Sequence, residues 1–255
     1  MNRIVLLLSY HGKKYHGWQI QPNAVSVQST IEQTIHTLTR ETIEIIGCGR
    51  TDTGVHASQY FAHFDLNSKE AIQSKSLNAL LPPDIAIQKI YFDPLGEFHS
   101  RFDAIQRKYI YKLNTNKNPF CVDTSLYYSY NSTLDIKKMN ELSHFLLQNS
   151  SFQSFCKSDS GLMQFTCFLS ECQWTQINEH EFEFHIAANR FLRGMVRLIV
   201  GACLNYSKDK FSLQQFQTAF LAGQSIPHAW SVPAHGLSLV RVIYPDNIMN
   251  RLVSI

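Results

Sequence analysis

Two Asp-Xaa-Gly tripeptides are the residues in this sequence whose type and spacing first suggest catalysis. Asp52-Thr53-Gly54 lies in "GCGRTDTGVHA" (residues 47–57), and Asp159-Ser160-Gly161 lies in "KSDSGL". Aspartic proteases use two such tripeptides to bring together a pair of carboxylates that share one proton. The pattern therefore raises two hypotheses, a two-lobed protease or a single carboxylate with another task.

The residues around each aspartate argue against the protease. Arg50 lies two residues before Asp52, and a nearby guanidinium favours the ionised carboxylate and opposes a shared proton. Asp159 lies in a polar stretch without an apolar flank. We interpret Asp52 as an ionised carboxylate suited to nucleophilic or base catalysis, oriented by Arg50. The alternative is that Arg50 and Asp52 only form an ion pair that stabilises a turn.

The elements that must position Asp52 follow a regular order in the first half. Strand 3–10 leads to a helix capped by Ser26, and a second helix, capped by Ser68, ends at Pro82. The apolar patterns predict strand 3–10, a helix with Val27, Ile31, Ile35 and Leu38 on one side, strands 42–48 and 58–66, helix 68–81 and strand 84–93. This β-α-β-β-α-β order is that of the ferredoxin-like unit.

The second half has the same order with one extra helix. The patterns predict strand 107–113, helix 134–148, a hairpin of strands 166–177 and 180–188, helices 191–206 and 212–223, and strand 236–244. We therefore predict an α+β protein of two ferredoxin-like halves, residues 1–104 with the Asp52 loop and residues 105–255.

Composition is that of an ordinary globular protein. The 255 residues are 44% hydrophobic and 17% charged, and the net charge of +3 allows a nucleic-acid partner without requiring one. The apolar run near residue 4 is too short for a membrane span and has no signal-peptide cleavage site. The six cysteines form no CxxC pair, so we expect reduced thiols in a cytoplasmic protein, and the eleven histidines lack metal-ligand spacing, so we expect no metal site.

A family resemblance rests on the longer string "GRTDTGVHA" and on five segments around it. The string resembles the catalytic loop of the tRNA pseudouridine synthase A (TruA-type) family, whose usual form has Ala at the place of Thr53. The segments that resemble the family, in the family's order, are "YHGWQIQPNAVSVQ" (15–28), "LNALLPPDI" (77–85), "FHSRFDAIQRKYIYKL" (98–113), "NRFLRGMVRLIVG" (189–201) and "PAHGLSLVRVIYP" (233–245).

The resemblance implies a fold and an activity. It implies that the sheets of two ferredoxin-like halves join into one largely antiparallel sheet, with a central catalytic cleft. It also implies isomerisation of uridine to pseudouridine in the anticodon stem-loop of tRNA, at positions 38 to 40, by a homodimer without cofactor.

The resemblance also assigns roles to individual residues. Asp52 would be the essential carboxylate, and Arg50 would position the RNA backbone or hold the loop open around a flipped nucleotide. Tyr109 matches the active-site tyrosine and can stack on uracil, whereas Tyr111 is expected to pack in the core. Arg197 matches the basic residue that pairs with the catalytic aspartate.

Further residues are expected to contact the RNA. Arg190, Arg193 and Arg197 have the spacing of one helical face, which faces either a cleft or solvent. Leu237 matches an apolar residue that packs against the base, with Leu239 as the alternative. Basic residues expected along an RNA path are Lys13, Lys14, Arg101 and Arg107.

Two other functions compete with the synthase. A non-catalytic RNA-binding module would present aromatics in a "GFGFV"-type strand, and the sequence has no such strand. An aspartic protease would need Asp159 as much as Asp52. The chemical role of Asp52 stays open between attack on the ribose, addition to the uracil ring and removal of a sugar proton.

Overall fold

A central strand that is buried on both faces organises the sheet of the first half. In the computed structural model, which describes residues 1–67, 72–129, 134–156 and 164–255, β1 (Asn2–Tyr10) lies between β3 (His56–Leu66) and β4 (Ile85–Asp93). It is antiparallel to both neighbours. Consecutive residues Val5 and Leu6 are both fully buried, so at this point of the strand neither face meets water.

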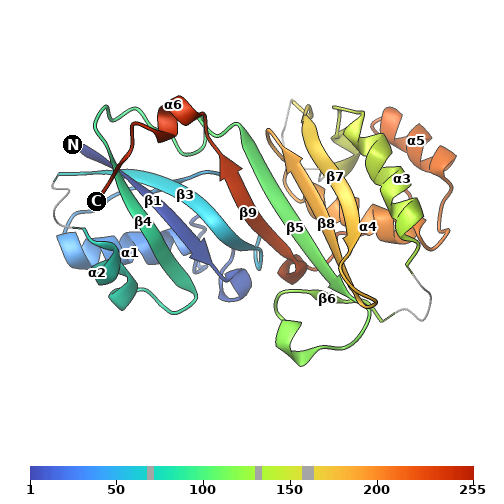
Figure 1. Cartoon of the computed structure of the whole chain (residues 1–255), viewed down its shortest axis with the longest axis horizontal. Coiled ribbons are helices and arrows are strands. Elements are labelled where there is room, and N and C mark those ends of the chain that lie inside the picture. Colours follow the sequence, from blue (N-terminus) through green and yellow to red (C-terminus); the bar gives the residue numbers. More distant parts are fainter. Residues whose placement is uncertain (68–71, 130–133, 157–163) are drawn as a thin grey trace. The chain divides into compact units, whose positions relative to one another are not determined.

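Two helices pack on this sheet. α1 (Val27–Thr39) starts where the sequence predicts, because the Ser26 hydroxyl accepts a hydrogen bond from the Ser29 backbone N–H at 3.1 Å. α2 (Ser74–Leu80) packs against α1 and β4 (Figure 1). The predicted cap of this second helix, Ser68, lies outside the described residues.

The predicted strand 42–48 is shorter in the structure. β2 is only Ile46–Gly47, paired antiparallel with β3. The backbone N–H of Ile45 donates instead to the side chain of Glu32 in α1, at 2.9 Å. A helix side chain therefore replaces a strand partner at this position, and the β-branched residues before it do not extend the sheet.

The last residues of the chain belong to the first unit. β9 (Leu237–Ile243) runs parallel to β3, with His56 opposite Ser238, and β10 (Val253–Ser254) pairs with β4 after the short helix α6 (Asp246–Met249). The compact units are therefore residues 1–107 with 238–255, and residues 108–237. This division differs from the predicted halves, because the closing strand finds its partner in β3.

The described part of the second unit contains four strands and three helices. Its strands follow the order β5 (Gln106–Asn114), β8 (Glu181–Ala188) and β7 (Leu169–Gln176), with β6 (Leu126–Tyr127) parallel to β5. Its helices are α3 (Ile136–Leu147), α4 (Met195–Tyr206) and α5 (Leu213–Leu221). The predicted hairpin is confirmed, since β7 and β8 pair antiparallel. α3 packs on β7 and on α4 (Figure 1).

The predicted start of the helix 191–206 is wrong. α4 begins at Met195, because Gly194 precedes it with a φ of 73°, in the left-handed region that ends a right-handed helix. Arg190 and Arg193 therefore lie before the helix, and only Arg197 lies on it. The three arginines do not form the helical face that their spacing suggested.

The predicted class is confirmed. The described part of the chain is a mixture of six α-helices and ten strands that pair mostly antiparallel, as expected for an α+β protein. None of the described helices is long and apolar enough to cross a membrane.

A buried histidine joins β3 to the segment that follows β4. His63, 2% exposed, accepts a hydrogen bond at Nδ1 from the Ser100 backbone N–H at 3.1 Å. The Ser100 hydroxyl lies 2.9 Å from the same nitrogen and donates to the carbonyl of Ile46 at 2.6 Å. Burial, with a smaller effect of the Arg3 charge, lowers the pKa of His63 to about 4. The neutral ring that this network needs is therefore the stable form.

This lowered pKa predicts a loss of stability in acid. The unfolded chain binds a proton at His63 near pH 6.5, whereas the folded chain binds it only near pH 4. The His63 contribution is therefore complete above pH 6.5 and decreases as the pH falls towards 4. We expect the unfolding free energies of wild type and His63→Gln, measured with urea, to converge over this window. A constant difference between them would contradict the assignment.

Candidate active site

Asp52 lies in the loop that connects β2 to β3, and its side chain is half-buried. Its carbonyl accepts a hydrogen bond from the Val55 N–H at 3.1 Å. Gly54, inside this turn, has a φ of 81°, a conformation that favours glycine. The turn directs the chain into β3, which begins at His56.

The end of β1 and the segment that follows it form hydrogen bonds with this loop. The Tyr10 hydroxyl and the Thr51 hydroxyl are 2.8 Å apart, and the Trp18 N–H donates to the Thr51 carbonyl at 3.3 Å. The Gly54 N–H donates to the carbonyl of Tyr15 at 3.3 Å. Thr51, before Asp52, and Gly54, after it, are thus both held by hydrogen bonds to residues 10–18.

Two glycines let this segment approach the loop closely. A Cβ on Gly12 would lie 2.0 Å from the Val55 carbonyl oxygen, and one on Gly17 would lie 2.3 Å from the Thr51 carbonyl oxygen. Gly17 also has a φ of 89°. Distances this short exclude any side chain, so the string "HGW" around Gly17 serves the packing of the Asp52 loop.

Side chains from elsewhere in the first unit hold the backbone ahead of Asp52. Arg107 donates to the carbonyl of Cys48 at 2.9 Å, and the Tyr60 hydroxyl donates to the carbonyl of Gly49. The Cys48 N–H donates to the Phe61 carbonyl of β3 at 2.8 Å. With Ser100 on Ile46, three of the four carbonyl groups from residue 46 to residue 49 accept a hydrogen bond from a side chain.

Arg50 has a different environment from the one expected. Its side chain is exposed, and within the described residues no ion pair joins it to Asp52. The turn-stabilising ion pair is therefore not found in this structure. An exposed guanidinium two residues from a half-buried carboxylate remains available for an anionic ligand such as a phosphate.

Tyr109 and Tyr111 lie on β5 of the second unit and differ in burial. Tyr109 is half-buried, and its ring meets that of Phe191 edge to face, with centroids 5.3 Å apart. Tyr111 is fully buried, and its hydroxyl donates to the Pro233 carbonyl at 2.9 Å. Burial raises the pKa of Tyr111. The expectation that Tyr111 packs in the core is confirmed.

Of the three arginines before and on α4, Arg197 is fixed by the backbone. Its Nε donates to the Val232 carbonyl at 2.7 Å, and its own carbonyl accepts from the Val232 N–H at 3.3 Å. Arg190 donates to the Gln164 side chain at 3.2 Å, and Arg193 is exposed. Leu237 and Leu239 are 5% and 1% exposed, so both alternatives for the apolar residue are buried.

The four basic residues predicted on the RNA path have different surroundings. Lys13 and Lys14 are exposed, and Lys14 forms an ion pair with Asp84 at 3.2 Å. Arg101 is also exposed. Arg107 donates to three backbone carbonyls, those of Cys48, Arg101 and Ala104. Its guanidinium therefore supports the fold of the first unit, which sequence reasoning did not anticipate.

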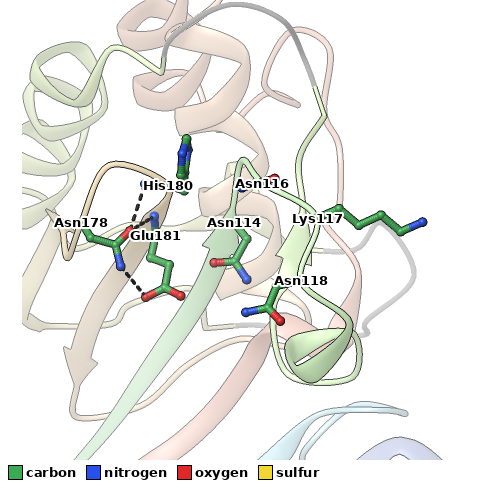
Figure 2. Close-up of a pocket in the computed structure, with 7 residues that line it drawn as sticks. All are labelled: Asn114, Asn116, Lys117, Asn118, Asn178, His180 and Glu181. Atoms are coloured by element: carbon green, nitrogen blue, oxygen red, sulfur yellow. Dashed lines mark hydrogen bonds between the residues drawn. The ribbon is translucent and has the colours of Figure 1, made fainter.

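A polar pocket of about 290 Å³ lies in the second unit, where β5 ends and β7 turns into β8 (Figure 2). Its lining residues are Asn114, Asn116, Lys117, Asn118, Asn178, His180 and Glu181. The dashed bonds in Figure 2 hold Asn178 against the backbone and carboxylate of Glu181. None of the predicted site residues lines this pocket, so it does not define the active site.

Other predicted features have these outcomes. None of the six cysteines forms a disulfide, and four of them are buried. No group of histidine, cysteine, aspartate and glutamate side chains among the described residues could hold a metal ion. Asp159, the second carboxylate of the protease hypothesis, lies outside the described residues.

Comparison with known proteins identifies the family of this chain. A family model described as tRNA pseudouridine synthase matches residues 7–103 and 149–245. The chain belongs to the tRNA pseudouridine synthase family. Its class is therefore that of an isomerase acting on tRNA.

Individual relatives match over nearly their whole length. A tRNA pseudouridine synthase A of Azobacteroides pseudotrichonymphae is 42% identical over 249 residues, which cover 96% of this chain and 98% of the relative. One of Bacteroides fragilis is 39% identical, with 97% and 98% covered. One of Bacillus licheniformis is 34% identical, with 96% and 100% covered. The synthase resemblance of the six sequence segments is thus confirmed at the level of the family.

Sequence reasoning missed the residues that hold the loop of this synthase. Tyr60, His63 and Ser100 carry no motif of their own, and only their hydrogen bonds reveal their role. A weak signal exists for Gly12 and Gly17, since glycines near a proposed catalytic loop suggest close backbone approach. Nothing in the sequence separates Arg107 from an arginine that binds phosphate.

Substitution of Gly17 tests the close approach. We expect Gly17→Ala to lower the unfolding free energy by about 2 kcal/mol or more, because the new Cβ meets the Thr51 carbonyl and the left-handed φ adds strain. Gly49→Ala is the matched control, since a Cβ there meets nothing within 4 Å, and we expect a change within about 0.5 kcal/mol. Urea unfolding measures both. Equal effects at the two glycines would argue against the packing.

An experiment can distinguish whether Arg107 binds a phosphate of the RNA or supports the fold. An arginine that binds phosphate contributes about one unit to the slope of log K against log salt for tRNA binding. Because Arg107 donates to carbonyls, we expect Arg107→Gln to leave this slope unchanged while kcat falls. Arg101→Gln, with an exposed side chain, is the control and should reduce the slope. A reduced slope in Arg107→Gln would return this residue to the RNA path.

Proposed function

We propose that the chain converts uridine to pseudouridine in the anticodon stem-loop of tRNA, at positions 38 to 40, with Asp52 as the essential carboxylate and without a cofactor. The observation that carries the proposal is the string "GRTDTGVHA" in a chain that matches synthase relatives over 96% and 97% of its length. The hydrogen bonds that fix the backbone on both sides of Asp52 support this proposal.

The chemistry needs no external reagent. The N1–C1′ bond of uridine breaks, a C5–C1′ bond forms, C5 loses a proton and N1 gains one. The product is an isomer of the substrate, so electrons and atoms balance without an oxidant, a reductant or a group donor. The protein must hold the detached base, turn it and keep water from the sugar.

Asp52 would supply its carboxylate to one of three steps: attack on the ribose, addition to the uracil ring or removal of a sugar proton. Each step needs a carboxylate that does not move while the base turns. The turn around Gly54 and the contacts of Thr51 restrict the backbone at this residue. Arg50, exposed beside it, would hold the RNA backbone near the flipped nucleotide.

The remaining residues complete the proposed site. Tyr109, half-buried against Phe191, would stack on the uracil. Arg197 would act as the cationic partner of the catalytic aspartate, and Leu237, with Leu239 as the alternative, would pack against the base. RNA phosphates would be met by Lys13, Lys14, Arg101, Arg190 and Arg193. Two further parts of the proposal are a homodimer as the working form and a cytoplasmic location.

The proposal is tested on unmodified tRNA transcripts. We expect wild type to form pseudouridine within positions 38 to 40, and Asp52→Asn to lose activity by about a thousandfold or more, because the amide neither attacks nor accepts a proton. The measurement is nucleotide-resolved mapping of pseudouridine with time.

Two outcomes would contradict the proposal. The control Asp159→Ala should keep full activity, whereas a protease built on both tripeptides would lose its activity with either aspartate. A folded wild type that binds tRNA but forms no pseudouridine would instead favour the non-catalytic RNA-binding module. Product at other uridines would correct the substrate position alone.

A further inference from the structure

The turn between β4 and β5 presents an exposed aromatic ring. Phe102 is 74% exposed, and its ring stacks on that of His99 with centroids 4.2 Å apart and planes 30° apart. The guanidinium of Arg101 lies 5.6 Å from the centre of the same ring. Single exposed apolar residues are common and need no explanation. Phe102 differs from such residues because a second ring and a guanidinium already pack against its ring.

The turn around Phe102 is braced from within. The N–H groups of Arg101 and Phe102 both donate to Nδ1 of His99 at 3.2 Å. The N–H of His99 donates to the Asp103 carboxylate at 2.7 Å, and the Asp103 N–H donates to the His99 carbonyl at 3.1 Å. Four hydrogen bonds thus fix the backbone that carries the ring, and the ring itself rests against His99.

The same turn is attached to the body of the first unit. The Tyr244 hydroxyl donates to the Ser100 carbonyl at 2.6 Å, and the Ile105 N–H donates to the Ile243 carbonyl at 2.8 Å. Arg107 donates to the carbonyls of Arg101, at 2.5 Å, and Ala104, at 2.7 Å. The turn is therefore a rigid part of the unit and not a free loop.

Arg107 links this turn to the catalytic loop. One of its terminal nitrogens, Nη2, donates both to the Arg101 carbonyl, next to Phe102, and to the Cys48 carbonyl, four residues before Asp52. A single nitrogen atom thus holds the turn and the entry to the loop at a fixed separation. A ligand group bound on Phe102 would therefore lie at a fixed distance from Asp52.

We propose that Phe102, backed by His99 and flanked by Arg101, is a stacking platform for an unpaired nucleobase of the tRNA substrate next to the nucleotide that reacts. The proposal rests on the proposed function and adds a binding site to it. Aromatic faces bind single-stranded bases because every base has a π-face, and an adjacent guanidinium strengthens the stack and meets the phosphate.

Other occupants fit less well. A phosphate alone has no use for the ring, and the Asp103 carboxylate in the same turn disfavours an anion that is not held by Arg101. One exposed ring and its neighbours offer far less area than a stable interface between two protein copies, about 800 Å² on each partner. A flat, uncharged base beside a phosphate matches both the ring and the cation.

The test compares substitutions of Phe102 by tRNA affinity and by kinetics. We expect Phe102→Ala and Phe102→Leu to raise Kd and KM for tRNA by about tenfold or more, since stacking on an aromatic ring contributes roughly 1–3 kcal/mol per base. Phe102→Trp should restore wild-type affinity, because it restores the π-face. Phe120→Ala is the control, since Phe120 is an even more exposed phenylalanine, at 95%, in the second unit, and it should change neither constant.

The outcomes separate this proposal from the proposed function. Absence of pseudouridine in wild type would overturn the function, whereas the platform is decided by tRNA affinity in the Phe102 variants. Leucine restoring the affinity would show a simple apolar contact, and unchanged affinity in Phe102→Ala would show no contact. Either result overturns the platform. A variant that dissociates in sedimentation while wild type is a dimer would also overturn it, in favour of an interface between copies.

Discussion

The hydrogen bonds that side chains donate to the backbone just ahead of Asp52 are the constraint on which the rest of the site depends. Ser100, Arg107 and Tyr60 occupy the carbonyls of Ile46, Cys48 and Gly49. A loop between two strands would otherwise expose these carbonyls to water and sample several conformations. Their occupation makes this surface loop a fixed support for the carboxylate proposed to be catalytic, because each donor comes from a part of the chain that is itself well packed.

Arg107 is the most connected of these donors. Its three carbonyl acceptors lie in the Asp52 loop and in the turn before β5, so it joins two segments that are far apart along the chain. Guanidinium groups are suited to this because several N–H donors are held in one plane. A lysine, with one charged nitrogen on a flexible stem, would not hold the three carbonyls in the same geometry.

The other side of the loop depends on close backbone approach rather than on side-chain donors. Gly12 and Gly17 let the segment after β1 reach the carbonyls of Val55 and Thr51 at distances that no side chain permits. The parallel pairing of β9 with the first residues of β3 then fixes where the loop ends. The isomerisation proposed for this site benefits from such rigidity, because the base must turn while the carboxylate stays in place.

The sequence by itself determined the family, the order of the elements and the identity of the Asp52 loop. These follow from local patterns: strand alternation, the Ser26 cap confirmed on α1, and a string of nine residues that matches a family. It did not determine which strand β9 pairs with, where α4 starts or which groups Arg107 contacts. The sequence of β9 does not say which strand it pairs with, and only the packed structure places it beside β3. The sequence around Gly194 is compatible with a helix, and only its φ of 73° in the structure shows that α4 starts after it. An arginine in a sequence can bind phosphate or backbone carbonyls equally well, and the tertiary structure decided for the carbonyls because it brings residues 48, 101 and 104 within reach of one guanidinium.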